Sequence, residues 1–124
     1  MQLRDDRPDV HLGGHWGLFG GAIDGNEALD EALTREMEEE LGFVPEGAAY
    51  FTRFDYDASF FGRPGDVLTR HYYVVHAPPE AVDNFRLGEG QRFQFFEPRA
   101  ILDGLQIAPY DSFILWLHIS QDRV

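Results

Sequence analysis

The sequence has no cysteine among its 124 residues. Disulfide bonds, thiolate catalysis and cysteine-ligated zinc are therefore excluded. Basic residues are also scarce, since 10 stand against 22 acidic residues and leave a formal net charge of −12. A protein that binds nucleic acid needs a basic surface, so we expect no duplex nucleic acid as a partner. A small phosphorylated ligand fits this charge only where a cation, such as a divalent metal ion, supplies positive charge.

Long apolar runs are missing as well. No stretch approaches the ~20 residues of a membrane-spanning helix, and the first residues lack the apolar core of a signal peptide. We therefore expect no membrane partner and, by default, a cytoplasmic location. Hydrophobic residues still make up 44% of the chain, which is enough for one packed core. The length predicts a single domain over residues 1–124.

Strands and helices are predicted to be mixed along the chain. Gly42 is well placed to end a helix over residues 29–41. Aromatic and β-branched residues predict two strands, which are joined by a turn that contains two glycines and a proline. The predicted elements are a loop-rich start at 1–19, a helix at 29–41, strands at 48–57 and 67–77, a turn at 62–66, a short strand at 93–96, and helices beginning at Pro98 and after Pro109. This mixture predicts an α/β or α+β sandwich.

The helix at 29–41 carries acidic residues on its apolar side. With Glu36 set at zero and about 100° per residue, the apolar residues Leu29, Ala32 and Leu33 fall within roughly 60° of it. Glu40 lies on the same face at about 40°, and Glu39 lies at its edge near −60°. Glu38 points the opposite way, to solvent. The pattern therefore predicts Glu36 and Glu40 on the buried face.

Buried carboxylates are costly unless they are paired or bind a metal. Side chains at positions i, i+3 and i+4 of a helix converge on one patch, which here holds Glu36, Glu39 and Glu40. Oxygen ligands suit Mg²⁺, which commonly bridges protein carboxylates to substrate phosphates, and Arg35 can hold one carboxylate in place. The alternative is a solvated acidic run, which is the usual fate of such a segment. The inward placement of Glu36 and Glu40 favours the metal site.

These residues also form a known motif. The segment Gly21-x5-Glu27-x7-Arg35-Glu36-Met37-x-Glu39-Glu40-x-Gly42-Phe43 resembles the complete Nudix box over residues 21–43. The resemblance implies a Nudix-type α/β/α sandwich with a mixed sheet. It also implies a hydrolase that uses Mg²⁺, or Mn²⁺ as a substitute, on a nucleotide substrate.

The resemblance assigns roles by position. Glu39 and Glu40 are similar to the main metal ligands, Glu36 to a further ligand or water-activating carboxylate, and Arg35 to its orienting partner. Glu27 resembles an outer glutamate that supports the metal, and the Gly20 carbonyl resembles a main-chain ligand. Glu89 resembles a glutamate contributed by a later loop, and Glu97 competes with it for that role. The residues implied in catalysis are thus Arg35, Glu36, Glu39 and Glu40, and those implied at the metal are Gly20, Glu27, Glu36, Glu39, Glu40 and Glu89.

Of the departures of the chain from the family pattern, two affect secondary structure. Ala28 stands where a serine or threonine often caps the helix, so we expect that cap to be lost. The N-terminal strand is predicted to be shortened or absent, because only Met1-Gln2-Leu3 precedes a polar segment and a normal strand has ~5–6 residues. An unpaired strand edge tends to recruit another chain. We therefore expect either a homodimer or a natural chain that starts upstream of Met1.

The leading hypothesis is Mg²⁺-dependent hydrolysis of a phosphoanhydride bond in a nucleoside diphosphate linked to another moiety. The alternative is a non-catalytic Nudix-fold module that binds a nucleotide or a protein. A third hypothesis, an acidic interaction domain, requires no metal binding at all. The substrate and the glutamate that serves as general base stay open, because specificity lies in loops outside the box.

Overall fold

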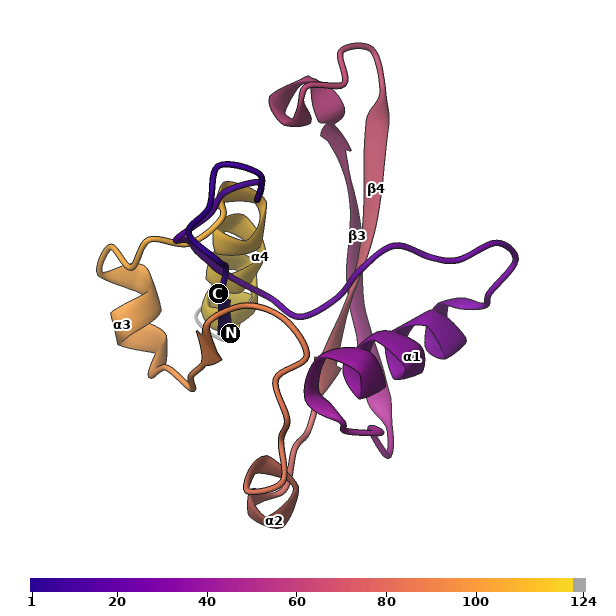
Figure 1. Ribbon diagram of the computed structural model, residues 1–124, viewed down its shortest axis with the longest axis vertical. Helices are drawn as coiled ribbons and strands as arrows, with labels where there is room; N and C mark the ends of the chain where they lie inside the picture. The colour runs from indigo at the N-terminus through magenta and orange to yellow at the C-terminus, as the bar shows by residue number, and fades with distance from the viewer. Residues whose placement is uncertain (122–124) are drawn as a thin grey trace. The chain divides into compact units, whose positions relative to one another are not determined.

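The computed structural model describes residues 1–121, apart from the side chains of Phe60 and Phe61 (Figure 1). The chain divides into two compact units, one formed by Met1–Phe19 with Glu89–Val124 and the other by Gly20–Gly88. Within residues 1–121, none of the helices combines the length and the apolar character that crossing a membrane requires.

The Gly20–Gly88 unit consists of one helix and one long hairpin with short additions. Its elements are α1 (Leu29–Leu41), β3 (Ala48–Asp57), the 3-10 turn η1 (Ala58–Phe61), β4 (Val67–Val75) and α2 (Pro79–Val82). The predicted helix and hairpin are confirmed, although β4 ends two residues before the expected 77. Sequence analysis missed α2, a single turn of four residues that begins at Pro79, where proline is favoured because its missing N–H is not needed.

The hairpin contains an irregularity between Tyr50 and Thr52. Tyr50 pairs with Tyr73 and Thr52 pairs with Tyr72, so one extra residue, Phe51, is inserted in β3. Such a bulge lets both halves of a strand keep one pairing pattern while the strand bends. The Tyr50 ring packs edge-on against Tyr73 at 5.2 Å between centroids, and its hydroxyl lies 3.0 Å from His71 Nδ1.

The core of this unit is formed by α1 and the hairpin. α1 contributes Ala32, Met37 and Leu41, and Tyr72 is buried on β4. Burial raises the pKa of the Tyr73 phenol, and the nearby Tyr50 and Asp30 raise it further.

The other unit holds a small sheet and two helices. Its elements are β1 (Gln2–Leu3), β2 (Trp16–Gly17), β5 (Arg92–Phe93), α3 (Pro98–Leu102) and α4 (Pro109–Ser120). The strand order is β2-β1-β5, and both pairings are antiparallel. α3 begins at Pro98 as predicted, and α4 begins at Pro109 itself and not after it. The strand expected at 93–96 lies at Arg92–Phe93.

The N-terminal strand is shortened, as predicted, to two residues. It nevertheless pairs on both sides, because Gln2 lies opposite Gly17 on β2 and opposite Phe93 on β5. The expectation that β1 would be missing beside an open edge is therefore not met. Trp16 anchors the unit, since it is 7% exposed, forms a parallel bridge with Ile107 and packs edge-on against Phe96 at 4.8 Å.

Candidate metal centre

The acidic residues of α1 divide between its two sides as the helical periodicity predicts. Glu40 is 4% exposed, and the Glu36 side chain is 15% exposed. The Glu39 side chain, at the edge of the face, is 59% exposed, and Glu38 is exposed. The inward placement of Glu36 and Glu40 is thus confirmed. A buried carboxylate needs a partner to offset its lost hydration, and the residues around α1 provide several.

The Arg35 guanidinium is the main partner of these carboxylates. Its Nη1 donates to Glu36 Oε1 at 2.9 Å and to Glu39 Oε2 at 3.2 Å. Two carboxylates therefore already converge on one positively charged nitrogen. The same guanidinium donates from Nη2 to the Ala22 carbonyl at 2.8 Å, which ties the preceding loop to the helix.

Glu27 binds the same guanidinium from the loop before α1. Arg35 Nε donates to Glu27 Oε2 at 2.8 Å, and Nη2 donates to Oε1 at 2.9 Å. This two-bond geometry is the strongest form of arginine–carboxylate pairing. The Arg35 hydrogen bond, followed by the Asp24 backbone N–H, lowers the pKa of Glu27. In return, hydrogen bonds to Glu27 and then Glu36 raise the pKa of Arg35 above its ordinary value.

Two glycines bring the loop backbone close to the carboxylates. Gly20 N–H donates to Glu40 Oε2 at 2.9 Å, which gives the buried carboxylate a direct partner. Gly21 lies against the Glu36 carboxylate so closely that a Cβ atom there would collide with it. Any larger residue at position 21 would therefore displace Glu36 or the loop. This contact gives a physical reason for glycine at the first position of the motif.

The arrangement fits a divalent cation by the chemistry of its donors. Within residues 1–121, no three His, Cys, Asp or Glu side chains already stand in a metal-binding arrangement. Glu36 and Glu39 nevertheless share one cationic nitrogen, and Glu40 sits on the same helix one residue further on. Carboxylate oxygens of this kind are the ligands that hard divalent cations prefer.

Two of the residues weighed for the metal belong to the other unit. Glu89 begins the second segment of the other unit, in the loop that precedes β5, and it is exposed. Glu97, its competitor, is the N-cap residue of α3 in that same unit. The Gly20–Gly88 unit thus brings together Gly20, Glu27, Arg35, Glu36, Glu39 and Glu40, and the role of Glu89 stays a prediction.

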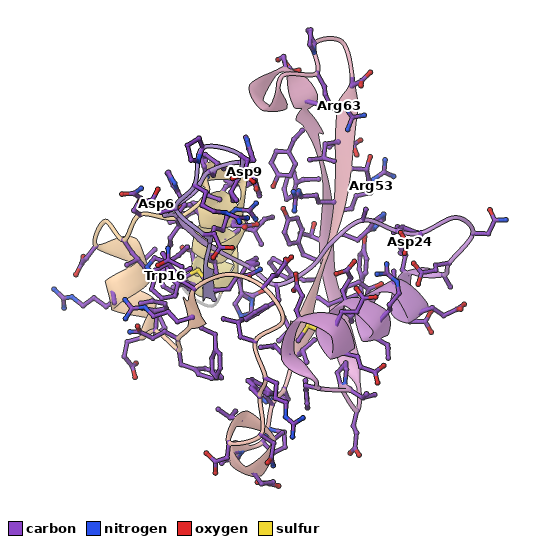
Figure 2. All side chains as sticks on the ribbon, viewed as in Figure 1. Asp6, Asp9, Trp16, Asp24, Arg53 and Arg63 are labelled. Atoms are coloured by element: carbon purple, nitrogen blue, oxygen red, sulfur yellow. The ribbon has the colours of Figure 1, made fainter. Side chains whose placement is uncertain are left out.

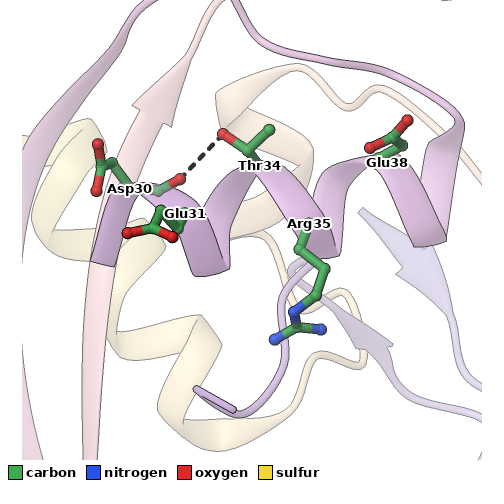
Figure 3. A pocket seen from close by; sticks show the side chains of 5 residues that line it. All are labelled: Asp30, Glu31, Thr34, Arg35 and Glu38. Carbon is green, nitrogen blue, oxygen red and sulfur yellow. Dashed lines mark hydrogen bonds between the residues drawn. The ribbon is translucent and has the colours of Figure 1, made fainter. Parts of the chain in front are cut away.

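A surface hollow lies on the opposite side of α1. It is lined by Asp30, Glu31, Thr34, Arg35 and Glu38, and Figure 3 shows Arg35 pointing away from Thr34 and Glu38. The Thr34 hydroxyl donates to the Asp30 carbonyl at 2.9 Å, within the helix. The hollow contains none of the three clustered carboxylates, so we place the candidate metal centre on the Glu36–Glu40 side.

Sequence analysis did not identify two partners of Arg35. Besides the Ala22 carbonyl, Asp24 Oδ2 lies 3.5 Å from Arg35 Nη2, and Figure 2 shows Asp24 in the loop that leads to α1. Asp24 also starts a turn in which the Glu27 N–H donates to the Asp24 carbonyl at 3.0 Å. An aspartate at the first position of a turn that contains Gly25 and Asn26 is a common pattern, so the turn was recognisable in the sequence.

Comparisons with known proteins identify similar sequences and a similar structure. The family model described as NUDIX domain matches residues 3–117. A crystal structure of a MutT NUDIX hydrolase from Burkholderia pseudomallei is similar, with a TM-score of 0.70 and 27% identity over 93% of this chain and 84% of that chain. This likeness confirms the predicted Nudix-type α/β fold.

Two curated relatives carry the name 8-oxo-dGTP diphosphatase. The relative from Haemophilus influenzae is 31% identical over 93 residues, which are 75% of this chain and 62% of that protein. The relative from Proteus vulgaris is 47% identical over 32 residues, 26% of this chain and 29% of that protein. The matches thus span less than two thirds of either relative. The match of the family model over most of the chain shows that this chain belongs to the NUDIX domain family.

Proposed function

We propose that this chain is a nucleotide pyrophosphohydrolase. It would hydrolyse a phosphoanhydride bond in a nucleoside diphosphate that is linked to another moiety. The observation that carries the proposal is the carboxylate cluster of α1, in which Glu36 and Glu39 share Arg35 Nη1 and Glu40 is buried against the Gly20 N–H. NUDIX proteins generally need a divalent metal ion, and for this chain we propose Mg²⁺, with Mn²⁺ as a substitute.

Each residue of the cluster has a proposed role. Glu39 and Glu40 would hold the metal with help from Glu36, the Gly20 carbonyl and, from a later loop, Glu89. Arg35 keeps Glu36 and Glu27 oriented through its hydrogen bonds. A bound Mg²⁺ would neutralise the diphosphate and lower the pKa of the attacking water. One glutamate of the cluster accepts the proton of that water.

The proposed substrate class is a nucleoside triphosphate with an oxidised purine base. This narrower proposal is supported by the names of the two curated relatives, 8-oxo-dGTP diphosphatase. The net charge of −12 gives the protein surface little attraction for the phosphates of a nucleotide. A metal ion held by these carboxylates would therefore supply the positive charge that such a substrate needs.

We also propose that the two compact units make up one NUDIX domain, since the matched residues 3–117 run through both. A cytoplasmic location and a homodimer stay proposals as well. β1 pairs on both sides and so leaves no edge of its own for a second copy to cover. Sedimentation at several protein concentrations tests the dimer, which a single monomer mass at all concentrations would contradict.

The experiment that tests the function is a substrate panel. The chain is incubated with Mg²⁺ and nucleoside triphosphates, oxidised purine nucleoside triphosphates, nucleotide sugars, ADP-ribose and dinucleoside polyphosphates, and released phosphate or pyrophosphate is measured. We expect hydrolysis of at least one compound and its loss in excess EDTA. Activity that persists in EDTA would exclude the metal mechanism. Nucleotide binding without hydrolysis would support the non-catalytic module instead.

A further inference from the structure

The last turn of α1 is held by a segment from a distant part of the chain. A helix leaves its last four carbonyls without partners inside the helix. Here the Leu41 carbonyl accepts the N–H of Arg86 at 2.8 Å, and the Glu40 carbonyl accepts the N–H of Gly88 at 2.8 Å. Residues 85–88, called here the 85–88 segment, therefore cap the helix at the proposed metal ligands.

Gly88 makes the closest approach in this segment. A Cβ atom at position 88 would collide with the carbonyl oxygen of Glu39, and it would lie 3.4 Å from the Cα of Glu40. The φ angle of Gly88 is not in the left-handed region that favours glycine. Glycine is thus required at position 88 because a side chain would have no room against the helix backbone. The backbone conformation of residue 88 does not itself require glycine.

The 85–88 segment is anchored before this contact by an aromatic side chain. The rings of Phe85 and Phe43 pack at 5.4 Å between centroids, just beyond the end of α1. Glu40 is consequently held twice, since its carboxylate accepts the Gly20 N–H and its carbonyl accepts the Gly88 N–H. A helix transmits a displacement of its backbone directly to the side chains it carries.

We infer that Gly88 is a positioning residue for the Glu39–Glu40 pair. Its lack of a side chain lets the 85–88 segment fix the last turn of α1 in the place from which both carboxylates reach one metal ion. The inference rests on the proposed function, because it takes Glu39 and Glu40 as metal ligands. Residue 88 lies 45 residues beyond the end of the motif at residue 43, so the placement of the proposed metal ligands also depends on a residue outside the motif.

Gly88→Ala tests this inference. The added methyl group must push the segment and the end of α1 apart. Misplacing a catalytic group by about 1 Å can cost on the order of 100-fold in rate, so we expect kcat to fall by roughly 10- to 100-fold while KM changes little. We also expect Mn²⁺ binding to the protein without nucleotide, measured by electron paramagnetic resonance, to weaken about 10-fold or more, as when other groups that support metal ligands are removed.

The matched control is Gly62→Ala at the far end of the hairpin. Gly62 has φ 74° and no neighbouring atom within 4 Å of an added Cβ, so alanine there is strained and lowers Tm without touching α1. We expect Gly62→Ala to keep wild-type Mn²⁺ affinity. If Gly88→Ala lowers Tm yet keeps wild-type Mn²⁺ affinity and kcat, Gly88 is merely structural and the inference is overturned.

A second variant tests the inference if Gly88→Ala does not fold. Where Gly88→Ala does not fold, Phe85→Leu replaces it, because this change loosens the ring contact with Phe43 and adds no bulk. Weaker Mn²⁺ binding by Phe85→Leu supports the inference, and unchanged binding overturns it. Because Mn²⁺ binding is measured without nucleotide, a wild-type protein inactive on the whole panel would remove the proposed function and leave the role of Gly88 still testable.

Discussion

The two ends of α1 are held in different ways. At the start, Ala28 has an extended backbone (φ −71°, ψ 159°) and makes no side-chain capping hydrogen bond. At the other end, the carbonyls of Met37, Glu38, Glu40 and Leu41 accept backbone N–H groups from beyond the helix. The proposed ligands Glu36, Glu39 and Glu40 lie in the well-held half. The chain therefore holds α1 firmly at the end where the carboxylates lie, and it caps the start of α1 only weakly.

Removing a proposed ligand from the well-held half should have the largest effect. Glu39→Gln and Glu40→Gln keep the size of the side chain but remove the charge that binds a metal in the transition state. We expect each to lower kcat by at least ~100-fold, measured on the substrate identified by the panel, with an unchanged circular dichroism spectrum. Normal kcat in both variants would show that the last turn does not carry the chemistry.

Glu38→Gln is the control for these two variants. Glu38 lies in the same turn but is exposed on the other side of α1. We expect its kcat to stay within about twofold of the wild type, because surface substitutions away from a site are usually nearly silent. A loss as large as that of Glu40→Gln would mean that the whole turn, and not its inner face, is sensitive.

Arg35 connects the two halves, so its replacement should disturb both. Arg35→Gln leaves Glu27, before the helix, and Glu36 and Glu39, within it, without their shared cation. Because the pKa of Glu27 is lowered in the folded protein, the stability from this pair is complete above the ordinary glutamate pKa of about 4.3. It is lost as the pH falls through the lowered value.

The measurement is Tm for the wild type and for Arg35→Gln from pH 7 to pH 3. We expect a lower Tm for the variant at pH 7 and a difference that shrinks below about pH 4. A difference that stays constant down to pH 3 would show that Arg35 stabilises the protein by packing and not through these carboxylates.

The weakly held start of α1 should accept a stabilising change. Ala28→Ser supplies a hydroxyl that can accept a first-turn N–H, and the extended backbone of Ala28 suits a capping residue. We expect the free energy of unfolding to rise by about 1 kcal/mol, measured by urea denaturation, with kcat unchanged. A fall in kcat that accompanies the gain in stability would mean that the start of the helix must stay loose for activity.

Much of the site could be predicted because it follows helical periodicity. The spacing of Glu36, Glu39 and Glu40 on one helix determined which of them would be buried, and Glu40 at 4% exposure bears this out. The strand at 48–57 was predicted at its observed bounds because aromatic and β-branched residues fill it and Gly-rich turns flank it.

The rest could not be predicted because it depends on backbone contacts between distant residues. The Gly88 N–H donates to the Glu40 carbonyl, although 48 positions separate these residues in the sequence. The pattern of side chains does not predict such a bond between two backbone groups. β1, β2 and β5 have two residues each, which is shorter than any alternation of polar and apolar residues that a sequence can show. The Ala22 carbonyl that Arg35 binds is likewise a main-chain group that any residue would supply.

The inserted residue Phe51 determines how the hairpin would respond to a change in chain length. Successive residues of a strand point to opposite faces, so a shift of one position exchanges the faces of everything on one side of it. Tyr50 and Thr52 pair with the consecutive residues Tyr73 and Tyr72, so deleting Phe51 would straighten β3 and leave the pairing of both halves in place. Tyr50 would then remain opposite Tyr73 and keep its ring contact. Among one-residue deletions in β3, loss of Phe51 should therefore be less damaging than loss of a paired residue such as Phe54, which would shift one half of β3 along β4.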